Sequence, residues 1–247
     1  GDMACGEYGQ GKMTKPTEIV SNIEQYFSNL KKNNNFKALV TAGPTHEYID
    51  PVRFITNKSS GKQGFAIAKS LANKGFETTL ITGPTNLNIE NNINIIKVET
   101  ADQMFEATRN SLPVDVAIFS AAVSDFKLKK QRNIKIKKQE SINLDLEKNI
   151  DILNYVSNHN SLRPKLVIGF AAETNDLEIN AQKKLHEKNC DWIIANDVSN
   201  KSIGFDSEFN EVSVFYKNKD INSEKLNMKK KSEISDEITD RVISHLN

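Results

Sequence analysis

Apolar runs of strand length alternate along this chain with segments of helical period. The first run, Lys37–Ala42, predicts a buried strand, and Gly61–Lys74 repeats its apolar residues along one helix face before it stops at Gly75. Further strands are predicted at Thr78–Thr82, Ile93–Val98, Val114–Ser120, Leu166–Ala171, Trp192–Ala195 and Val212–Tyr216, and further helices at Ala101–Asn110, Asp151–Ser157, Leu177–Lys188 and Glu233–Leu246. This alternation predicts a three-layer α/β domain with a Rossmann-like, mostly parallel sheet covered by helices.

Two stretches depart from the alternation. Ile134–Lys138 and Ile142–Glu147 alternate apolar and polar side chains around a short turn, so we expect a half-exposed β-hairpin that projects from the sheet. Residues 1–35 begin with a glycine-rich stretch, continue with a lone amphipathic helix at Thr17–Leu30 and end in a polar run. The chain is therefore divided into a tail and linker at 1–35 and an α/β domain at 36–247.

Composition and charge exclude several classes of protein. The 247 residues include 33 Lys+Arg and 32 Asp+Glu, and this net charge of +1 gives no basic field for nucleic acid or an anionic membrane. Hydrophobic residues make up 38% and charged residues 26%, as in a globular protein. The 2 cysteines lie far apart, the first residues lack the basic-then-apolar pattern of a signal peptide, and the given sequence has no apolar run of membrane-spanning length. We expect a soluble, cytoplasmic protein.

Ligands of open parallel sheets bind beyond the carboxyl ends of the strands. Asn57–Gly64 opens a predicted helix with hydroxyls, small residues and a lysine, where free N–H groups and the helix dipole favour a phosphate. The segment is not a P-loop, because Gln63 replaces the Ser or Thr that would hold magnesium. The dinucleotide fingerprint G-x-G-x-x-G is absent as well. A glycine-rich helix cap without a ligand is the alternative interpretation.

Other candidate residues follow the remaining strands. In Ser120–Asp125 small side chains leave room for a flat ligand. The carboxylate of Asp125 either accepts hydrogen bonds from the hydroxyls or amides of that ligand or caps a turn. Lys135 lies on the lysine-rich predicted strand, which either meets an anion or only protects a sheet edge. Phe170 suits stacking on a base, while Lys184 and Lys188, one helical turn apart, either meet a polyphosphate or face solvent. The residues alone predict a nucleotide or phosphate ligand.

Taken in order, these motifs resemble those of phosphopantothenoylcysteine synthetase from about Lys37 to the end of the chain. The matching strings are Thr41–Thr45, Asp50–Asn57, Ser59–Lys62, Ala121–Asp125, Lys135–Lys138, Gly169–Thr174 and Ala195–Asp197. Ala4–Met13 is similar to the last motif of phosphopantothenoylcysteine decarboxylase, which precedes the synthetase in bacterial bifunctional coenzyme A biosynthesis proteins. The resemblance implies a synthetase domain behind a decarboxylase tail at residues 1–20, with Cys5 matching the decarboxylase proton donor and idle here. A naturally short chain with a glycine-rich start is the alternative.

The resemblance implies a two-step ligation. The carboxylate of 4′-phosphopantothenate attacks the α-phosphate of CTP and gives an acyl-cytidylate and pyrophosphate, after which the amine of L-cysteine attacks the acyl group and releases CMP. Mg²⁺ is the implied cofactor, and FMN belongs only to the missing decarboxylase domain. The family synthetase is a homodimer whose projecting hairpin helps form the subunit contact.

The resemblance also implies roles for single residues. Lys135 matches the essential lysine of the activation step, and Asn57 matches the asparagine that converts the acyl-cytidylate to product. The matched nucleotide contacts are Phe119, Ser120, Ala121, Asp125, Lys135, Asp151, Ile152, Leu153, Asn154, Phe170, Lys184 and Lys188, with Ser59 and Ser60 in the phosphate loop. The matched phosphopantothenate contacts are Asn57, Ala121, Ala122, Asp125 and, from the neighbouring subunit, Arg53. No magnesium ligand is assigned.

One departure and two alternative functions complete this picture. Ile150 stands where bacterial members have a proline, so the backbone contacts of Asp151–Asn154 are less fixed. An NAD(P)-dependent oxidoreductase on the same fold lacks support, because the glycine fingerprint and a strand-end acid are missing. A non-catalytic nucleotide-binding module is the other alternative. CTP rests on the bacterial resemblance alone, since the eukaryotic counterpart is expected to use ATP.

Overall fold

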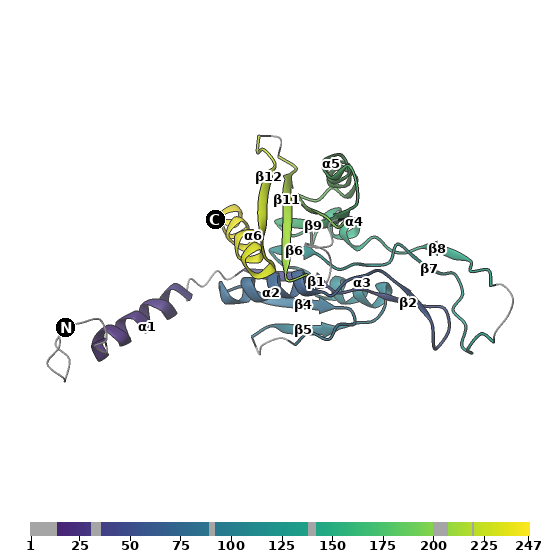
Figure 1. Cartoon of the computed structure of the whole chain (residues 1–247), viewed down its shortest axis with the longest axis horizontal. Coiled ribbons are helices and arrows are strands. Elements are labelled where there is room, and N and C mark those ends of the chain that lie inside the picture. The colour runs from purple at the N-terminus through teal and green to yellow at the C-terminus, as the bar shows by residue number, and fades with distance from the viewer. Residues whose placement is uncertain (1–13, 31–35, 89–91, 138–141, 200–206, 219) are drawn as a thin grey trace.

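An eight-stranded sheet forms the centre of the protein, in the order β12-β11-β10-β9-β6-β1-β4-β5 (Figure 1). The computed structural model describes residues 14–30, 36–88, 92–137, 142–199, 207–218 and 220–247. The strands of this sheet are β1 (Lys37–Ala42), β4 (Glu77–Thr82), β5 (Asn94–Lys97), β6 (Val116–Phe119), β9 (Leu166–Glu173), β10 (Trp192–Asp197), β11 (Phe209–Tyr216) and β12 (Glu224–Lys230). Strand β11 pairs antiparallel with both β10 and β12, while the other neighbouring strands of this sheet pair parallel, so the predicted mostly parallel α/β sheet is confirmed.

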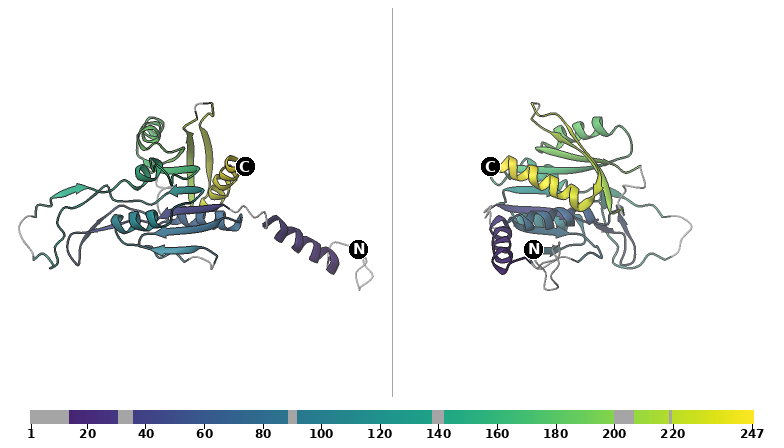
Figure 2. Two further views of the ribbon diagram at one scale, coloured as in Figure 1. Left: turned by 180° about the vertical axis from the view of Figure 1, so that it is seen from behind. Right: turned by 60° about the vertical axis from the view of Figure 1, so that its left-hand side comes forward.

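Helices cover both faces of the sheet. They are α2 (Lys62–Asn73), α3 (Ala101–Asn110), α4 (Ile152–Ser157), α5 (Leu177–Lys188) and α6 (Lys231–Leu246). Successive strand residues point to opposite faces. Val40 of β1 therefore packs with Leu71 of α2 and Ile238 of α6, while its neighbour Leu39 joins the core under α3, α4 and α5 with Met104. Figure 2 shows from two further sides that α6 lies beside α2.

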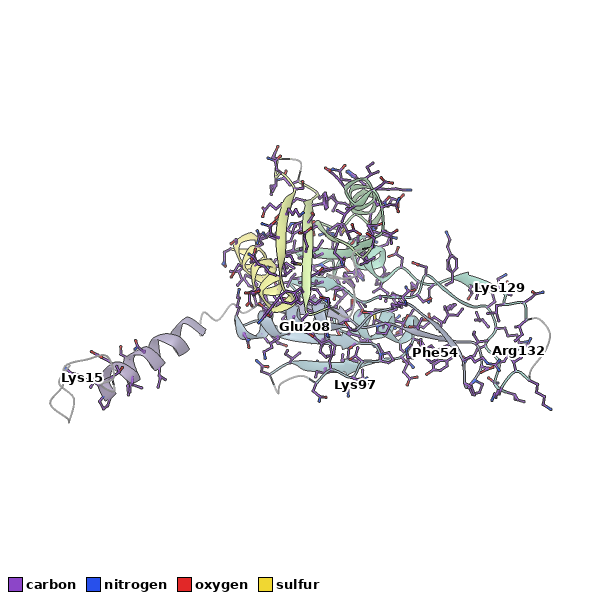
Figure 3. All side chains as sticks on the ribbon, viewed as in Figure 1. Lys15, Phe54, Lys97, Lys129, Arg132 and Glu208 are labelled. Carbon is purple, nitrogen blue, oxygen red and sulfur yellow. The ribbon has the colours of Figure 1, made fainter. Side chains whose placement is uncertain are left out.

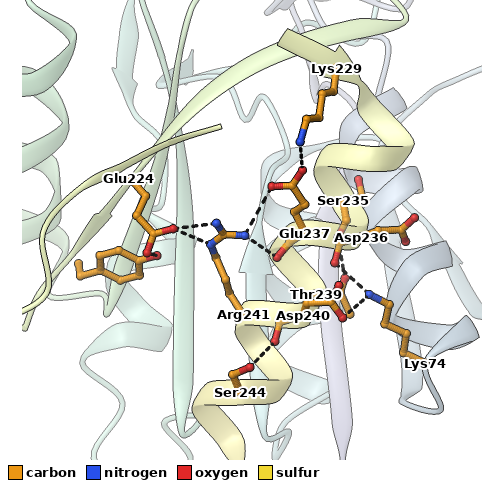
Figure 4. A network of polar contacts seen from close by, with 11 residues as sticks. Lys74, Glu224, Lys229, Ser235, Asp236, Glu237, Thr239, Asp240, Arg241 and Ser244 are labelled. Carbon is orange, nitrogen blue, oxygen red and sulfur yellow. Dashed lines mark hydrogen bonds and ion pairs between the residues drawn. The ribbon is translucent and has the colours of Figure 1, made fainter. Parts of the chain in front are cut away.

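Polar contacts hold α6 against the strand and helix on either side of it (Figure 4). Arg241 pairs with Glu224 of β12 at 2.7 Å, and Lys74 of α2 pairs with Asp240 at 2.6 Å. Burial lowers the pKa of Arg241, but the Glu224 carboxylate raises it by more. The pKa of Arg241 therefore lies above its usual value. These contacts orient α6 so that its first residue, Lys231, lies at the carboxyl-terminal edge of the sheet beside the first turn of α2.

A projecting arm leaves the sheet opposite α6 (Figure 1). We define the arm as strands β2 (His46–Tyr48), β3 (Phe54–Thr56), β7 (Phe126–Leu128) and β8 (Leu146–Lys148), with residues 49–53 and 129–137, which follow β2 and β7, and residues 142–145, which precede β8. Strand β2 pairs antiparallel with β3, and β7 pairs antiparallel with β8. Figure 3 labels Phe54, Lys129 and Arg132 along it.

The predicted hairpin strands within the arm are wrong. Residues 134–137 form no strand, and of the predicted second strand only Leu146 and Glu147 belong to one, which pairs with Phe126–Leu128. An alternating pattern does not identify the partner of a strand, because the same period suits any exposed pair. Strand β12 was not predicted, because its sequence has too few apolar residues to show the pattern of a strand. A polar, lysine-rich sequence suits its position at the edge of the sheet. Lys138 lies outside the described residues.

The other predicted elements are confirmed, with ends shifted by a few residues. Helix α3 begins with a capping box, in which Thr100 accepts a hydrogen bond from the backbone N–H of Gln103 at 3.2 Å. Helix α1 (Pro16–Leu30) stands apart from the sheet (Figure 1), and its described side chains up to Ile23 are exposed. No helix among the described residues is long and apolar enough to cross a membrane. The cytoplasmic location stays a prediction.

Gly64 in the first turn of α2 is a position where a methyl group does not fit. A Cβ there would lie 2.4 Å from Oγ of Ser120 and 2.6 Å from Cβ of Ala42. Glycine-to-alanine changes inside helices usually stabilise by about 1 kcal/mol. We expect Gly64→Ala to lower the free energy of unfolding by about 1–3 kcal/mol instead, because α2 must move away from the strand ends. Urea denaturation measures the change, and Asn73→Ala at the exposed last residue of α2 is the control.

Candidate functional site

A cavity of about 760 Å³ lies at the carboxyl ends of β1, β6, β9 and β10. It straddles the edge of the sheet, with α2 and α6 on one side and α4 and α5 on the other. The predicted site residues that line it are Asn57, Ser59, Ser60, Phe119, Ser120, Ala121, Ala122, Asp125, Asp151, Ile152, Leu153, Phe170, Lys184 and Lys188. Residues from five separate parts of the chain thus meet in one place.

Backbone hydrogen bonds join the loops that follow β1 and β6 at the floor of the cavity. The N–H of Ala122 donates to O of Gly43 at 2.9 Å, and Pro44 forms an isolated parallel bridge with Ala122. The N–H of Ser124 donates to Oγ1 of Thr45 at 3.0 Å. The sheet pairing therefore continues beyond the strands and fixes the backbone that leads to Asp125.

Asn57 and the start of α2 form the second wall. The Nδ2 amide of Asn57 donates to O of Val123 at 2.9 Å, which places it opposite the Ala121–Asp125 loop. Gly61 precedes α2 with a φ of 75°, a left-handed conformation that favours glycine, and its N–H donates to Oγ of Ser59 at 3.2 Å. This geometry exposes the first turn of α2 to the cavity, as an anion site at a helix N-terminus requires.

Lysines and a carboxylate from α4 and α5 form the third wall. Asp151 accepts a hydrogen bond from the N–H of Asn154 at 2.9 Å as the cap of α4, and its other oxygen pairs with Lys188. Nζ of Lys184 donates to O of Phe170 at 2.9 Å. Burial lowers the pKa of Lys184, while the Glu173 carboxylate opposes the shift. The turn into α4 thus forms with Ile150 in place of proline.

Three predicted site residues do not line the cavity. Arg53 and Lys135 lie on the arm, and Asn154 is an exposed residue of α4 whose backbone N–H donates to Asp151. The cavity of one chain therefore brings together Asn57, Asp125 and Phe170 but not Lys135, whose place in a crevice shared with a second subunit stays a prediction. Cys5 lies outside the described residues. The other cysteine, Cys190, is buried, and its burial raises the thiol pKa to about 12.

Sequence reasoning missed the α6 side of the cavity. Lys231 and Asn210, both buried, line it there, and Nδ2 of Asn210 donates to Oε1 of Gln63 at 2.9 Å. Lys62 lines the same side and pairs with Glu208, which Figure 3 labels. The Lys62 ammonium holds the pKa of Glu208 below its usual value. The run of lysines that ends at Lys231 could have indicated an anion site. No sequence pattern marks Asn210, because the predicted strand begins only at Val212 and β11 begins at Phe209.

No metal centre stands out among the described residues, where no three His, Cys, Asp or Glu side chains gather to hold an ion. The cavity offers the carboxylates of Asp125 and Asp151 and the hydroxyls of Ser59 and Ser60. Magnesium commonly binds through one or two carboxylates, substrate phosphates and water. The donors present suit an ion that arrives with a phosphorylated ligand.

Comparisons with known proteins agree with this geometry. Residues 34–246 match the family described as the DNA/pantothenate metabolism flavoprotein C-terminal domain. The "Coenzyme A biosynthesis bifunctional protein CoaBC" of Haemophilus influenzae is 40% identical over 246 residues, which are 98% of this chain and 60% of the relative. That of Bacillus subtilis is 38% identical over 254 residues, with 98% and 60% covered. The chain therefore spans about 60% of the length of these relatives.

Solved structures include a crystal structure of the C-terminal domain of coenzyme A biosynthesis bifunctional protein CoaBC. It superposes with a TM-score of 0.71 at 39% identity, covering 85% of this chain and 95% of that one. The DNA/pantothenate metabolism flavoprotein from Streptococcus pneumoniae gives a TM-score of 0.71 at 27% identity, with 85% and 99% covered. The similarity thus extends over nearly the whole length of both solved chains.

Proposed function

Because this chain belongs to the family of DNA/pantothenate metabolism flavoprotein C-terminal domains, we propose that it ligates 4′-phosphopantothenate to L-cysteine. The observation that carries the proposal is the cavity, in which Asn57, Asp125 and Phe170 meet from separate parts of the chain. The similar bifunctional proteins of coenzyme A biosynthesis support the same reaction. In the parent protein we place FMN and the proton donor Cys5 in a decarboxylase domain, so we expect Cys5 to be idle here.

In the proposed first step, a carboxylate oxygen of 4′-phosphopantothenate bonds to the α-phosphorus of CTP while the bond to pyrophosphate breaks. Both reactants are anions, so cations must offset their repulsion. Lys184 and Lys188 supply them on the α5 side of the cavity, and Lys62 supplies one at the start of α2. The free N–H groups of the α2 N-terminus add donors for phosphate oxygens.

In the proposed second step, the amine of cysteine bonds to the acyl carbon, CMP leaves and the amine loses a proton. Negative charge develops on the acyl oxygen in the transition state. The Nδ2 amide of Asn57 carries two N–H groups, of which one donates to O of Val123. The other suits the developing oxyanion, and a neutral amide does not compete for the phosphates.

Arg53 and Lys135 act, on this proposal, in the cavity of a second copy of the chain. Both lie on the arm and outside the cavity of their own chain. The arm also exposes large apolar side chains outside this cavity, with Val52 57%, Phe54 41% and Leu146 39% accessible. Such a cluster is typical of a surface that another protein covers. We therefore propose a homodimer in which the arm of each subunit completes the site of the other.

CTP and Mg²⁺ are the proposed nucleotide and metal. The Asp125 carboxylate, together with phosphate oxygens of the substrate, would hold the metal, which would supply positive charge against the negative charge of the triphosphate. Phe170 suits stacking on the pyrimidine, and Asp125 suits hydroxyl or amide donors of either substrate. Asp151–Leu153 line the wall beside Phe170 with backbone and side-chain groups for the nucleotide.

The experiment that tests the function follows pyrophosphate before cysteine is present. We expect pyrophosphate release with CTP and 4′-phosphopantothenate, and ligated product with CMP only after cysteine is added. ATP in place of CTP tests the choice of nucleotide. Turnover of a nicotinamide cofactor, or nucleotide binding without pyrophosphate release, would contradict the proposed ligase and favour one of the two alternative functions.

A further inference from the structure

Asp50 is a buried carboxylate at the turn between β2 and β3, and it joins two segments of the arm. Its Oδ1 accepts hydrogen bonds from the N–H of Val52 at 2.8 Å and of Arg53 at 3.0 Å. Its Oδ2 accepts one from the N–H of Ile136 at 3.1 Å and pairs with Nη1 of Arg53 at 3.3 Å. Nη2 of Arg53 in turn donates to O of Ile136 at 3.1 Å. The side chain of Asp50 is 0% exposed, and both of its carboxylate oxygens accept hydrogen bonds.

These bonds order a segment that has no regular secondary structure. Residues 129–137 are exposed except for Ile136, which is 7% accessible. The N–H of Arg132 donates to O of Ile49 at 3.1 Å, so the segment meets the 49–53 turn at two places. Lys135 is the residue directly before the clamped Ile136, and it is exposed. The position of Lys135 therefore depends on Asp50.

Charge makes the clamp firm at neutral pH. Burial alone would raise the pKa of Asp50, but three donated N–H groups and the neighbouring guanidinium hold it below its usual value. The carboxylate therefore stays ionised, and Oδ2 attracts both the Ile136 amide and the Arg53 guanidinium. Charge-assisted hydrogen bonds of this kind are about twice as strong as neutral ones.

We propose that Asp50 is a positioning residue that presents Arg53 and Lys135 as one rigid unit to the cavity of a second copy of this chain. The proposal rests on the proposed function and adds a residue to which neither the motifs nor the cavity assign a role. Asp50 touches no substrate, because it is buried within the arm. It acts through the two cations that it holds at neighbouring places on the arm surface.

Asp50→Asn is the sharpest test, because the amide keeps the shape of the side chain. The Oδ1 position can still accept from Val52 and Arg53, but an NH₂ group at Oδ2 can neither accept from Ile136 nor pair with a guanidinium. We expect pyrophosphate release to fall by about 100-fold and the KM for 4′-phosphopantothenate to rise. The dissociation constant of CTP should stay within about twofold, because the nucleotide contacts lie in the cavity.

Asp145→Asn is the matched control for this change. Asp145 is a carboxylate of the arm that pairs with Lys129 at 3.3 Å, and its side chain is 76% exposed. The variant removes the same charge from the same arm without touching Arg53 or Ile136, so its rate should match the unchanged protein. Equal losses in both variants would overturn the proposal and indicate a general charge effect. Unchanged activity of Asp50→Asn would overturn it as well.

A hybrid dimer tests whether the clamp serves the other subunit. One chain carries Asp50→Asn and the other Asn57→Asp, each with its own affinity tag, and the hybrid is purified through both tags. Each single variant as a homodimer should be almost inactive in product formation. The hybrid should regain about half of the wild-type rate, because one of its two sites then combines an intact cavity with an intact arm.

The outcomes of the hybrid experiment are separable from those of the proposed function. An unchanged protein that makes no product contradicts the ligase. An active unchanged protein with an inert hybrid, or with no hybrid to purify, overturns the presentation of Arg53 and Lys135 to a second copy. A thermal unfolding midpoint of Asp50→Asn near that of the unchanged protein shows that the sheet domain is folded.

Discussion

Replacing Lys135 by glutamine should abolish pyrophosphate release from CTP and 4′-phosphopantothenate. Lys135 is an exposed cation on the arm, and we propose that it offsets the repulsion between the carboxylate and the triphosphate in a second subunit. Preorganised charges of this kind contribute about 100-fold to 1,000-fold to a rate, so a loss of that size is expected. The structure places the residue outside the cavity of its own chain, so nucleotide binding by the variant should persist.

Lys137→Gln is the matched control. Lys137 follows Ile136 on the same exposed segment and carries the same charge. If Lys135 acts as a specific group, the control should retain nearly all of its rate of pyrophosphate release. Equal losses in the two variants would show that the arm contributes only overall positive charge, and a wild-type rate in Lys135→Gln would contradict its proposed role.

Replacing Asn57 by aspartate should separate the two steps of the reaction. The carboxylate has no N–H group, so it cannot donate to the acyl oxygen, and it faces O of Val123, to which the amide of Asn57 donates. We expect pyrophosphate release to continue once per site, while product formation falls by about 100-fold or more. Rapid-quench kinetics should show a burst of pyrophosphate without ligated product, and the size of this burst measures the stalled acyl-cytidylate.

Asn196→Asp provides the same chemical change elsewhere in the cavity. Asn196 lies at the end of β10 and lines the cavity without a proposed role in either step. Its variant should keep both steps in proportion. A full rate of product formation in Asn57→Asp, or the same stalled intermediate in Asn196→Asp, would contradict the role proposed for the Asn57 amide.

The fold was largely predictable because its elements are long and locally consistent. Helices α3 and α5 begin and end at the predicted residues, since the Thr100 capping box and a clear helical period mark them. Strand β1 also has the predicted ends, because Gly43-Pro44 stops it. The cavity followed from these elements, since the loops after parallel strands converge on one edge of the sheet.

The arm was not predictable in the same way. Its order comes from a carboxylate that bonds backbone groups 86 positions away along the chain, as Asp50 does with Ile136. No periodic pattern records such a contact, so the alternating residues around Ile136 were interpreted as a strand. Lys231 was missed for a related reason: the position of the last helix against α2 is set by tertiary contacts such as Lys74 with Asp240. Local sequence therefore predicts elements better than their long-range attachments.

The ion pairs around the cavity have a consequence for how an anion enters it. Lys188 pairs with Asp151 and Lys62 pairs with Glu208, so each of these two ammonium groups has a carboxylate of its own chain as counterion. A triphosphate that binds these lysines must displace the two carboxylates from them, rather than small anions such as chloride from the solution. Binding then releases few small ions, so raising the ionic strength should weaken the affinity far less than the number of lysines suggests.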